Sequence, residues 1–293
     1  MSNLGMRGLL AMVAAISPWV VSGSAAQAKT TILTPFTPWN VDYGDKICTL
    51  RRGFGTKEKP SVIMMDRFGP TDSFQLTIVS DEFKTFMQGA ALTLRFGDHE
   101  ARRIVTVVPG KSGKKTATLL FGNTSLSETF SDNDDGWTPP VTPATEAAVK
   151  TIAISYYGHL RIFETGSLGK PFEALRKCTD NLVTTWGLDP KQQRALTKSP
   201  KPLSKPTWWL SSNDYPTGML NLGKQALVNF RLSVDAQGIP TACEIQSSYN
   251  DKTFDEVTCA TLMRRARFSP ALDAQGQAVP SFYVNTVRWI MRS

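Results

Sequence analysis

The chain has 293 residues, with 33 lysines and arginines against 25 aspartates and glutamates, and a net charge of +8. Much of the excess lies in residues 189–206, which hold five basic residues and one acidic residue, so the rest of the chain is nearly neutral. This distribution does not indicate a nucleic-acid surface, and the length is enough for two modest domains.

The N-terminus has the pattern of a secretory signal peptide over residues 1–28. Arg7 supplies the positive charge, the apolar run Gly8–Val21 is too short to span a bilayer as a helix, and Ala26-Gln27-Ala28 gives a cleavage site. We therefore predict a periplasmic protein that is cleaved after Ala28. The alternative is an uncleaved segment that anchors the protein in the inner membrane, facing the periplasm.

Four cysteines follow the signal segment, and export places them in an oxidising compartment. Four cysteines allow three pairings. We predict the pairs Cys48–Cys178 and Cys243–Cys259, because this choice keeps each disulfide within one domain. The Cys-x-x-Cys spacing of redox motifs and zinc knuckles does not occur.

Residues 29–188 are predicted to form a mainly β domain, an antiparallel sandwich or barrel with one helix at its C-terminal end. Short alternating apolar runs between turn residues predict strands over 61–65, 74–79, 92–96, 104–108, 116–121, 151–156 and 160–163. Pro171 suits the first turn of the helix, and Gly187 ends it. Cys178 lies beside the apolar face of this helix, where it can bond to Cys48 at the start of the sheet.

Residues 189–206 are predicted to be an extended interdomain linker. Prolines alternate with lysines here, and prolines favour polyproline geometry while like charges resist collapse. At about 3.1 Å per residue, such a segment would reach roughly 55 Å.

Residues 207–293 are predicted to form a small domain with the element order β-β-α-β. Alternation predicts strands over 225–234 and 239–246, joined by the turn Asp235–Gly238, and a last strand over 281–290. Thr253 and Glu256 have the spacing of a capping box, so the helix is expected to begin near Phe254.

Several short motifs of this segment stand in the order and spacing of one known domain. They are Asp214-Tyr215-Pro216, the strand Phe230–Asp235 with Gly238, Cys243–Ser248, Phe254-Asp255, Arg267–Ala271 and Val287-Arg288-Trp289. With them, residues from about 205 to 293 resemble the C-terminal domain of the energy-transducer TonB family. The resemblance implies an α+β fold and a non-enzymatic protein without a cofactor. It also implies a partner, an outer-membrane receptor or another periplasmic protein, in energy-coupled outer-membrane transport.

The resemblance further implies that an extended segment of the partner adds beside the last strand, a mode in which main-chain hydrogen bonds give affinity. The expected partner-binding residues are Phe282, Val284, Thr286, Arg288 and Ile290. Arg288, on the face opposite Val287 and Trp289, is expected to contact an acidic peptide. The alternative is that polar residues such as Asn285 and Arg288 block this edge against aggregation.

Two departures from the family leave other functions open. A cleaved N-terminus leaves no membrane helix, and the predicted linker is far shorter than the spacer of energy transducers. A soluble periplasmic binding or adaptor protein is therefore the first alternative. A periplasmic hydrolase with its site in the N-terminal domain is the second, although no Gly-x-Ser-x-Gly elbow is present.

The remaining motifs have ordinary structural interpretations. His99 and His159 are expected in solvated turns. Gly110–Lys115 lacks the Walker spacing and is expected at a basic hairpin tip, and Asp132–Gly136 lacks the ligand register of a calcium loop, so no metal is expected. The adjacent Trp208 and Trp209 are expected to pack in the core, with a contact role for one of them as the alternative.

Overall fold

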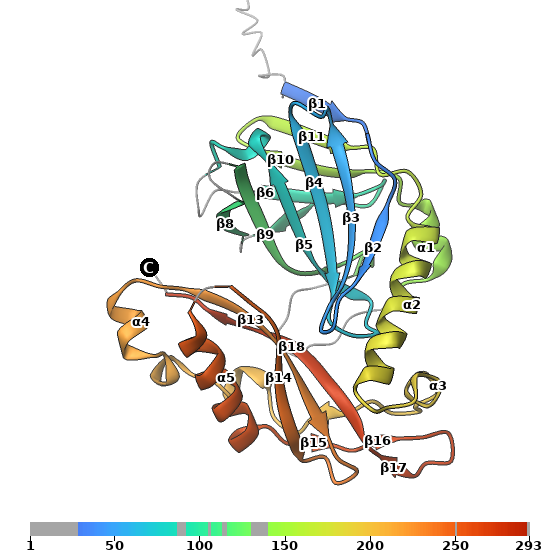
Figure 1. Cartoon of the computed structure of the whole chain (residues 1–293), viewed down its shortest axis with the longest axis vertical. Helices are drawn as coiled ribbons and strands as arrows, with labels where there is room; N and C mark the ends of the chain where they lie inside the picture. The colour runs from blue at the N-terminus through green and yellow to red at the C-terminus, as the bar shows by residue number, and fades with distance from the viewer. Residues whose placement is uncertain are drawn as a thin grey trace, which may run out of the picture.

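The computed structural model describes residues 29–86, 92–104, 107–112, 116–129, 140–249 and 251–291. The predicted signal peptide 1–28 and the acidic segment Asp132–Gly136 lie outside the described residues. Figure 1 shows the chain as an upper body of β-sheet flanked by a long helix and a lower body built from the C-terminal elements.

The described residues of the N-terminal part form two sheets and do not close into a barrel. The larger sheet is antiparallel, with the order β2 (Asn40–Tyr43), β3 (Cys48–Gly55), β4 (Pro60–Arg67), β5 (Ser73–Ser80), β9 (Thr116–Ser125) and β8 (Val107–Ser112). The second sheet has the order β1 (Lys29–Leu33), β11 (His159–Phe163), β10 (Ile152–Tyr156), β6 (Leu92–Phe96) and β7 (Arg102–Ile104). The prediction of a purely antiparallel domain is wrong for β1, which pairs with β11 in parallel. A parallel neighbour needs a long crossover, and most of the domain lies between these two strands.

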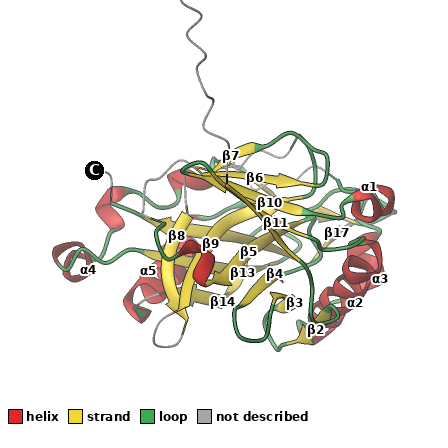
Figure 2. Cartoon of the chain, turned by 90° about the horizontal axis from the view of Figure 1, so that it is seen from above, coloured by secondary structure: helices red, strands yellow, loops and turns green. Residues whose placement is uncertain are grey.

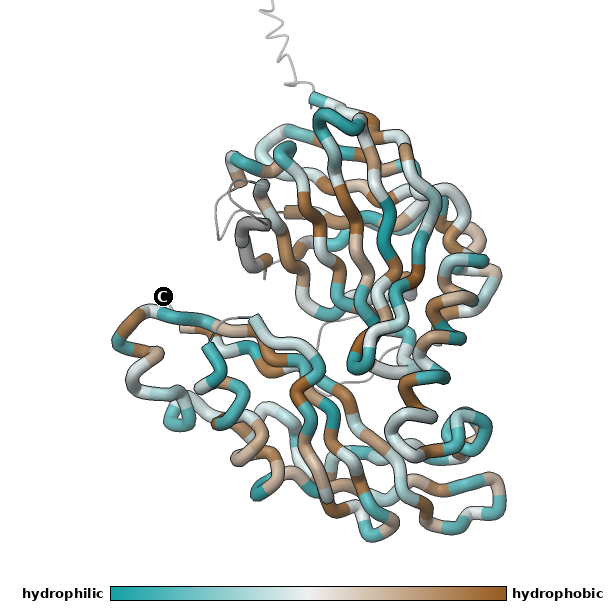
Figure 3. The backbone as a smooth tube through the Cα atoms, in the orientation of Figure 1, coloured by the Kyte–Doolittle hydropathy of each residue, from teal (hydrophilic) through white to brown (hydrophobic). Residues whose placement is uncertain are grey.

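Apolar side chains fill the space between the two sheets. Alternate residues of β3 and β4, such as Leu50, Ile63 and Met65, are fully buried in this core. The alternation follows from the two-residue period of a strand, and the hydropathy colouring of Figure 3 shows it along the strands. Phe74 contacts both Phe96 and Phe172 edge to face, at 6.0 Å and 5.7 Å between ring centroids. The core therefore also includes the face of the helix that carries Phe172.

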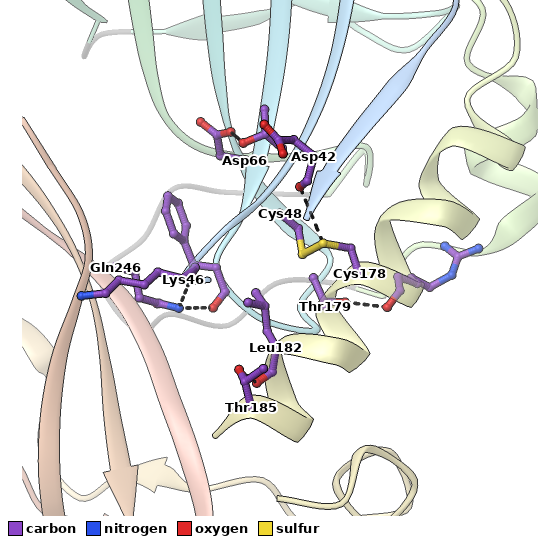
Figure 4. Close-up of a disulfide and its surroundings, with 12 residues drawn as sticks. Asp42, Lys46, Cys48, Asp66, Cys178, Thr179, Leu182, Thr185 and Gln246 are labelled. Atoms are coloured by element: carbon purple, nitrogen blue, oxygen red, sulfur yellow. Dashed lines mark hydrogen bonds between the residues drawn. A yellow bond between two sulfur atoms is a disulfide. The ribbon is translucent and has the colours of Figure 1, made fainter. Parts of the chain in front are cut away.

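That helix, α2 (Gly169–Thr185), is bonded to the sheet by the predicted Cys48–Cys178 disulfide, with 5.9 Å between the Cα atoms (Figure 4). The prediction of a single helix in this domain is wrong, because α1 (Pro143–Ala148) precedes it. The Thr142 side chain caps α1 and Pro143 stands in its first turn, so the starting signal is present but the helix is too short for a periodic pattern. Figure 2 shows these helices, with α3, grouped at one side of the molecule.

The prediction of an extended linker over 189–206 is also wrong. Asp189 caps a short helix, α3 (Pro190–Arg194), and β12 (Lys201–Pro202) pairs with β15 (Phe268–Ser269) of the C-terminal part. The Gln193 side chain also donates a hydrogen bond to the carbonyl of Pro280. The helix cap at Asp189 and the short β12–β15 pairing therefore fold a segment whose composition favours an extended chain.

The C-terminal part has the predicted β-β-α-β order. It consists of β13 (Ala226–Val234), β14 (Pro240–Tyr249), α5 (Lys252–Arg265) and β18 (Ser281–Trp289), with the smaller elements α4 (Thr217–Asn221), β16 (Ala271–Leu272) and β17 (Ala278–Val279). The sheet order is β14-β13-β18. The Cys243–Cys259 disulfide joins β14 to α5, as predicted. The helix begins at Lys252 with Asp251 as its cap, so the capping box predicted at Thr253 is wrong.

Candidate partner-binding strand

Strand β18 forms one edge of the C-terminal sheet. It pairs with β13 along its whole length, from Val234 opposite Ser281 to Ala226 opposite Trp289. Within the part of the chain that the structure describes, no strand pairs with the other side of β18. The predicted position of this strand, at a sheet edge, is therefore what strand addition requires.

Thr286 shows which main-chain groups of β18 point toward that outer side. Its N–H donates to the Oδ1 atom of Asn285 at 2.7 Å, and its Oγ1 donates across the strands to Oδ1 of Asn229 at 2.6 Å. Both contacts fit a position whose main chain does not bond to β13. Because main-chain direction alternates along a strand, the outward groups belong to Phe282, Val284, Thr286 and Arg288, and those of the residues between them point to β13.

Asn285 occupies part of this edge with its own side chain. Its Nδ2 atom donates to the hydroxyl of Tyr283 at 2.7 Å, and its Oδ1 atom accepts the outward N–H of Thr286. An incoming strand must therefore displace one local hydrogen bond. The hydrogen bond from the Thr286 N–H to the Asn285 side chain is consistent with the expected edge-blocking role of Asn285.

Three of the β18 side chains that were expected to meet a partner lie against the N-terminal part of the same chain. Phe282 contacts Trp186 edge to face, at 4.9 Å between ring centroids, and Val284 approaches Gly69. The Arg288 guanidinium lies beside Gly122 of β9, so close that a Cβ atom at that position would be 2.8 Å from Nη2. The Arg288 guanidinium therefore lies against the N-terminal part, and its expected contact with an acidic partner peptide stays a prediction.

The outcome differs for Ile290, which follows the end of β18. It is 47% exposed. Of the five predicted partner-binding residues, it is the one placed beyond the strand rather than on its covered face.

The other strands of the sheet extend the same contact. Asn229 of β13 donates to the Gln75 side chain at 2.8 Å, and both residues are buried. The Arg231 guanidinium lies over the Trp186 ring at 4.7 Å, and its burial lowers its pKa below the ordinary value. At β14, Gln246 donates to the carbonyls of Lys46 and Phe68 (Figure 4). One face of the sheet therefore packs on α5 and the opposite face packs on the N-terminal part.

The Asp214-Tyr215-Pro216 motif has a structural role on the α5 side. Asp214 accepts two hydrogen bonds from the Arg265 guanidinium, at 2.7 Å and 2.9 Å. This pairing lowers the pKa of Asp214 to about 2. The Tyr215 ring packs edge to face on Phe254 and on Trp289, at 5.6 Å and 5.5 Å between centroids. The motif therefore fixes the helix and the last strand together.

The histidines are less exposed than predicted. The His99 side chain is 14% exposed and lies 3.4 Å from the Glu128 carboxylate. His159 begins β11 and is half-buried, with its ring 5.7 Å from that of Tyr156. His99 lies in the predicted turn, where its N–H donates to the carbonyl of Phe96, but its side chain is mostly covered. The prediction of a turn is wrong for His159, which belongs to a strand.

A cavity of about 360 Å³ lies on the outer face of this sheet, lined by Thr93, Arg95, His99, Glu100, Ala101, Ala153, Ser155 and Leu160. Among the described residues, no hydrogen bond joins His99 to Thr93 or Ser155. A nucleophile activated by a base requires such a contact or a close approach to it. Among the described residues, the cavity therefore shows no nucleophile hydrogen-bonded to a base, and the hydrolase alternative stays untested.

Other features match their structural interpretations in part. Gly110 lies in the β8–β9 hairpin, where Ser112 pairs with Thr116. Trp209 is 2% exposed in the C-terminal core, whereas Trp208 is 70% exposed, so the prediction of core packing holds for one of the two. Within the described ranges, the structure contains no group of three or more potential metal ligands. Within the same ranges, no helix has the length and hydropathy that crossing a bilayer requires.

A three-stranded antiparallel sheet has one covering helix and, among the described residues, an edge strand with no outer neighbour. This arrangement defines a small α+β domain of the kind that can take a peptide by strand addition. Residues 211–291 match the family model described as Gram-negative bacterial TonB protein C-terminal, and this segment is a TonB C-terminal domain. Domains of this family interact with other proteins, such as outer-membrane receptors. Neither a curated protein nor a solved structure shows a significant match to the chain.

Proposed function

We propose that this protein binds a partner polypeptide by strand addition beside β18, in energy-coupled outer-membrane transport. The supporting observation is the coincidence of the family match over residues 211–291 with an edge strand that has no outer neighbour among the described strands. The partner is an outer-membrane receptor or another periplasmic protein. The protein acts in the periplasm by contact and not by catalysis. Residues 29–188 and 207–293 act as two domains.

The contact surface of this proposal differs from the one that the sequence suggests. The side chains of Phe282, Val284 and Arg288 contact the N-terminal part, and the Thr286 hydroxyl bonds to Asn229, so the partner meets the main-chain groups of these residues at the edge. Main-chain hydrogen bonds supply the affinity in strand addition. The N-terminal part covers one face of the sheet, and this contact leaves the outward main-chain groups at the β18 edge in place.

A soluble adaptor without energy transduction is a second candidate. It is favoured by the packing of residues 189–206 on the C-terminal domain and by the contact of Trp186 with Phe282. An energy transducer uses its spacer to reach across the periplasm, and here the segment before the domain is folded. Mass spectrometry of the mature N-terminus separates the two candidates, because a retained residue 1 in the membrane fraction supports transduction.

Strand addition is tested by placing proline at the outward main-chain position. Thr286→Pro removes an N–H that points away from β13, and prolines are tolerated at strand edges. We expect the full chain to lose affinity for receptor N-terminal peptides by about tenfold or more, which is the loss of one or two main-chain hydrogen bonds. Val287→Pro is the wrong probe, because the N–H of Val287 points to β13 and its loss disrupts the domain.

The matched control is Asn285→Ala, which releases the outward N–H of Thr286. Peptide binding is expected to be unchanged or stronger in this variant, because the local competitor is removed. Circular dichroism and thermal unfolding check that both variants are folded. If folded Thr286→Pro binds the peptides as well as the unmodified protein, the partner does not add beside β18.

A further inference from the structure

The segment from Lys201 to Trp208 presents a row of side chains to solvent. Lys201, Leu203 and Lys205 are exposed, whereas the residues between them are half-buried against the C-terminal domain. Lys201 and Pro202 form β12, and Leu203 and Ser204 form a bend after it. The chain then enters a 3₁₀ turn, Pro206–Trp208, and the N–H of Trp208 donates to the carbonyl of Lys205 at 2.8 Å, which brings these two residues close together. We name Lys201, Leu203, Lys205 and Trp208 the basic–apolar ridge.

The ridge is held by contacts underneath it. Lys201 and Pro202 pair with β15, and the N–H of Leu203 donates to the carbonyl of Arg267 at 2.9 Å. The Trp209 indole N–H donates to the Ser204 hydroxyl at 3.0 Å, and the Trp209 ring is buried. The backbone that carries the outward side chains is therefore held in place, although the composition of this segment predicts an extended linker.

The chemistry of the ridge combines large apolar groups with positive charge. Leu203 is 68% exposed and Trp208 is 70% exposed. No ion pair is formed by Lys201 or Lys205 within the described portion of the chain, and the exposed Arg267 lies beside Leu203. Three cations thus flank two apolar side chains, with no acidic side chain from position 190 to position 213.

We propose that the basic–apolar ridge binds an anionic membrane surface. Tryptophan prefers the boundary between headgroups and acyl chains, and leucine partitions into the same region. Lysine and arginine beside them are attracted to anionic headgroups. A polypeptide is usually bound in a groove or along a sheet edge, whereas here two isolated side chains protrude from a segment whose backbone is already paired. The charge and the protrusion together favour a lipid surface.

The test is co-sedimentation of the full chain with phospholipid vesicles, at low and at high salt. Vesicles that contain phosphatidylglycerol are compared with vesicles of phosphatidylcholine alone. We expect binding to the anionic vesicles that weakens as salt rises. The double variant Leu203→Ser with Trp208→Ser is expected to lower the partition coefficient about tenfold, because both interfacial anchors are lost. Lys201→Gln with Lys205→Gln is expected to remove most of the salt dependence.

Leu222→Ser is the matched control, because Leu222 is 66% exposed and lies outside the ridge. Thermal unfolding establishes that each variant is folded, and mass spectrometry establishes that all samples begin at the same residue. The proposal is overturned if the ridge variants sediment like the unmodified chain. This includes the case in which residues 1–28 hold every sample on the vesicles and the case in which no sample binds. It is also overturned if Leu222→Ser has the same effect. An acidic polypeptide that the ridge binds in preference to the vesicles would assign the surface to a protein instead.

Discussion

Trp186→Ala tests whether the two domains are packed together by side-chain contacts. The Trp186 ring lies between Phe282, at 4.9 Å between centroids, and the Arg231 guanidinium, 4.7 Å from the ring. The aromatic pair contributes about 1 kcal/mol beyond its buried area, and the cation–π contact contributes about 1 kcal/mol where it is partly desolvated. Loss of the remaining apolar contact of a half-buried tryptophan adds about 1 kcal/mol. We therefore expect the free energy of unfolding to fall by about 3 kcal/mol.

Urea unfolding followed by circular dichroism measures this change, and hydrogen exchange locates it. Amides of β13 and β18 that lie against Trp186 are expected to exchange faster in the variant, because their cover is loosened. Trp208→Ala is the matched control, since Trp208 is 70% exposed, and its effect is expected to stay within about 0.5 kcal/mol. A loss below about 1 kcal/mol for Trp186→Ala, with unchanged exchange in both strands, would refute the packing described above.

Three further predictions concern the C-terminal domain. Asn229→Ala leaves two covered polar partners unpaired and is expected to cost about 2–3 kcal/mol in urea unfolding, whereas a loss under about 0.5 kcal/mol would contradict the buried contact. Replacing both Cys243 and Cys259 by serine is expected to cost about 3 kcal/mol, because the disulfide closes a short loop, and an equal midpoint under reducing and oxidising conditions would argue against the bond. The pKa of Asp214 is about 2 in the folded state, below the unfolded value of about 3.9, so its pairing with Arg265 stabilises fully above pH 4 and is lost as the pH falls toward 2. Asp214→Asn is expected to remove about 1 kcal/mol near neutral pH after solvent screening and to flatten the acid limb of stability, and an unchanged limb would contradict the pairing.

Local patterns were enough to predict many elements of this protein. The alternating runs locate strands such as β4, β5 and β13, and the helical spacing after Pro171 locates α2. The choice of one disulfide within each domain is confirmed by both bonds. These features depend on residues that are close in sequence or on a simple count of alternatives. Helix α1 was missed because six residues are too few for a period to appear.

The contact between the N-terminal and C-terminal parts could not be predicted from such local patterns. Asn229, Arg231 and Thr286 form a polar stripe, and a polar stripe on a strand normally indicates a face in water. Here Asn229 meets Gln75 and Arg231 meets Trp186, both of them far away in sequence. The alternation of apolar and polar residues separates the two faces of a strand, but it does not show which surface covers the polar face.

The sequence alone determined the β-β-α-β order and the likeness of the C-terminal segment to a TonB C-terminal domain, because both depend on local period and spacing. It also determined the cysteine pairs, because four cysteines allow few pairings and one of these keeps each bond within one part of the chain. Tertiary structure decided that one face of the C-terminal sheet is covered by the N-terminal part, and that residues 189–206 fold against the C-terminal part instead of forming an extended linker. The physical reason is that both outcomes depend on which distant surfaces are complementary. Such complementarity arises only when the two domains are folded and placed against each other.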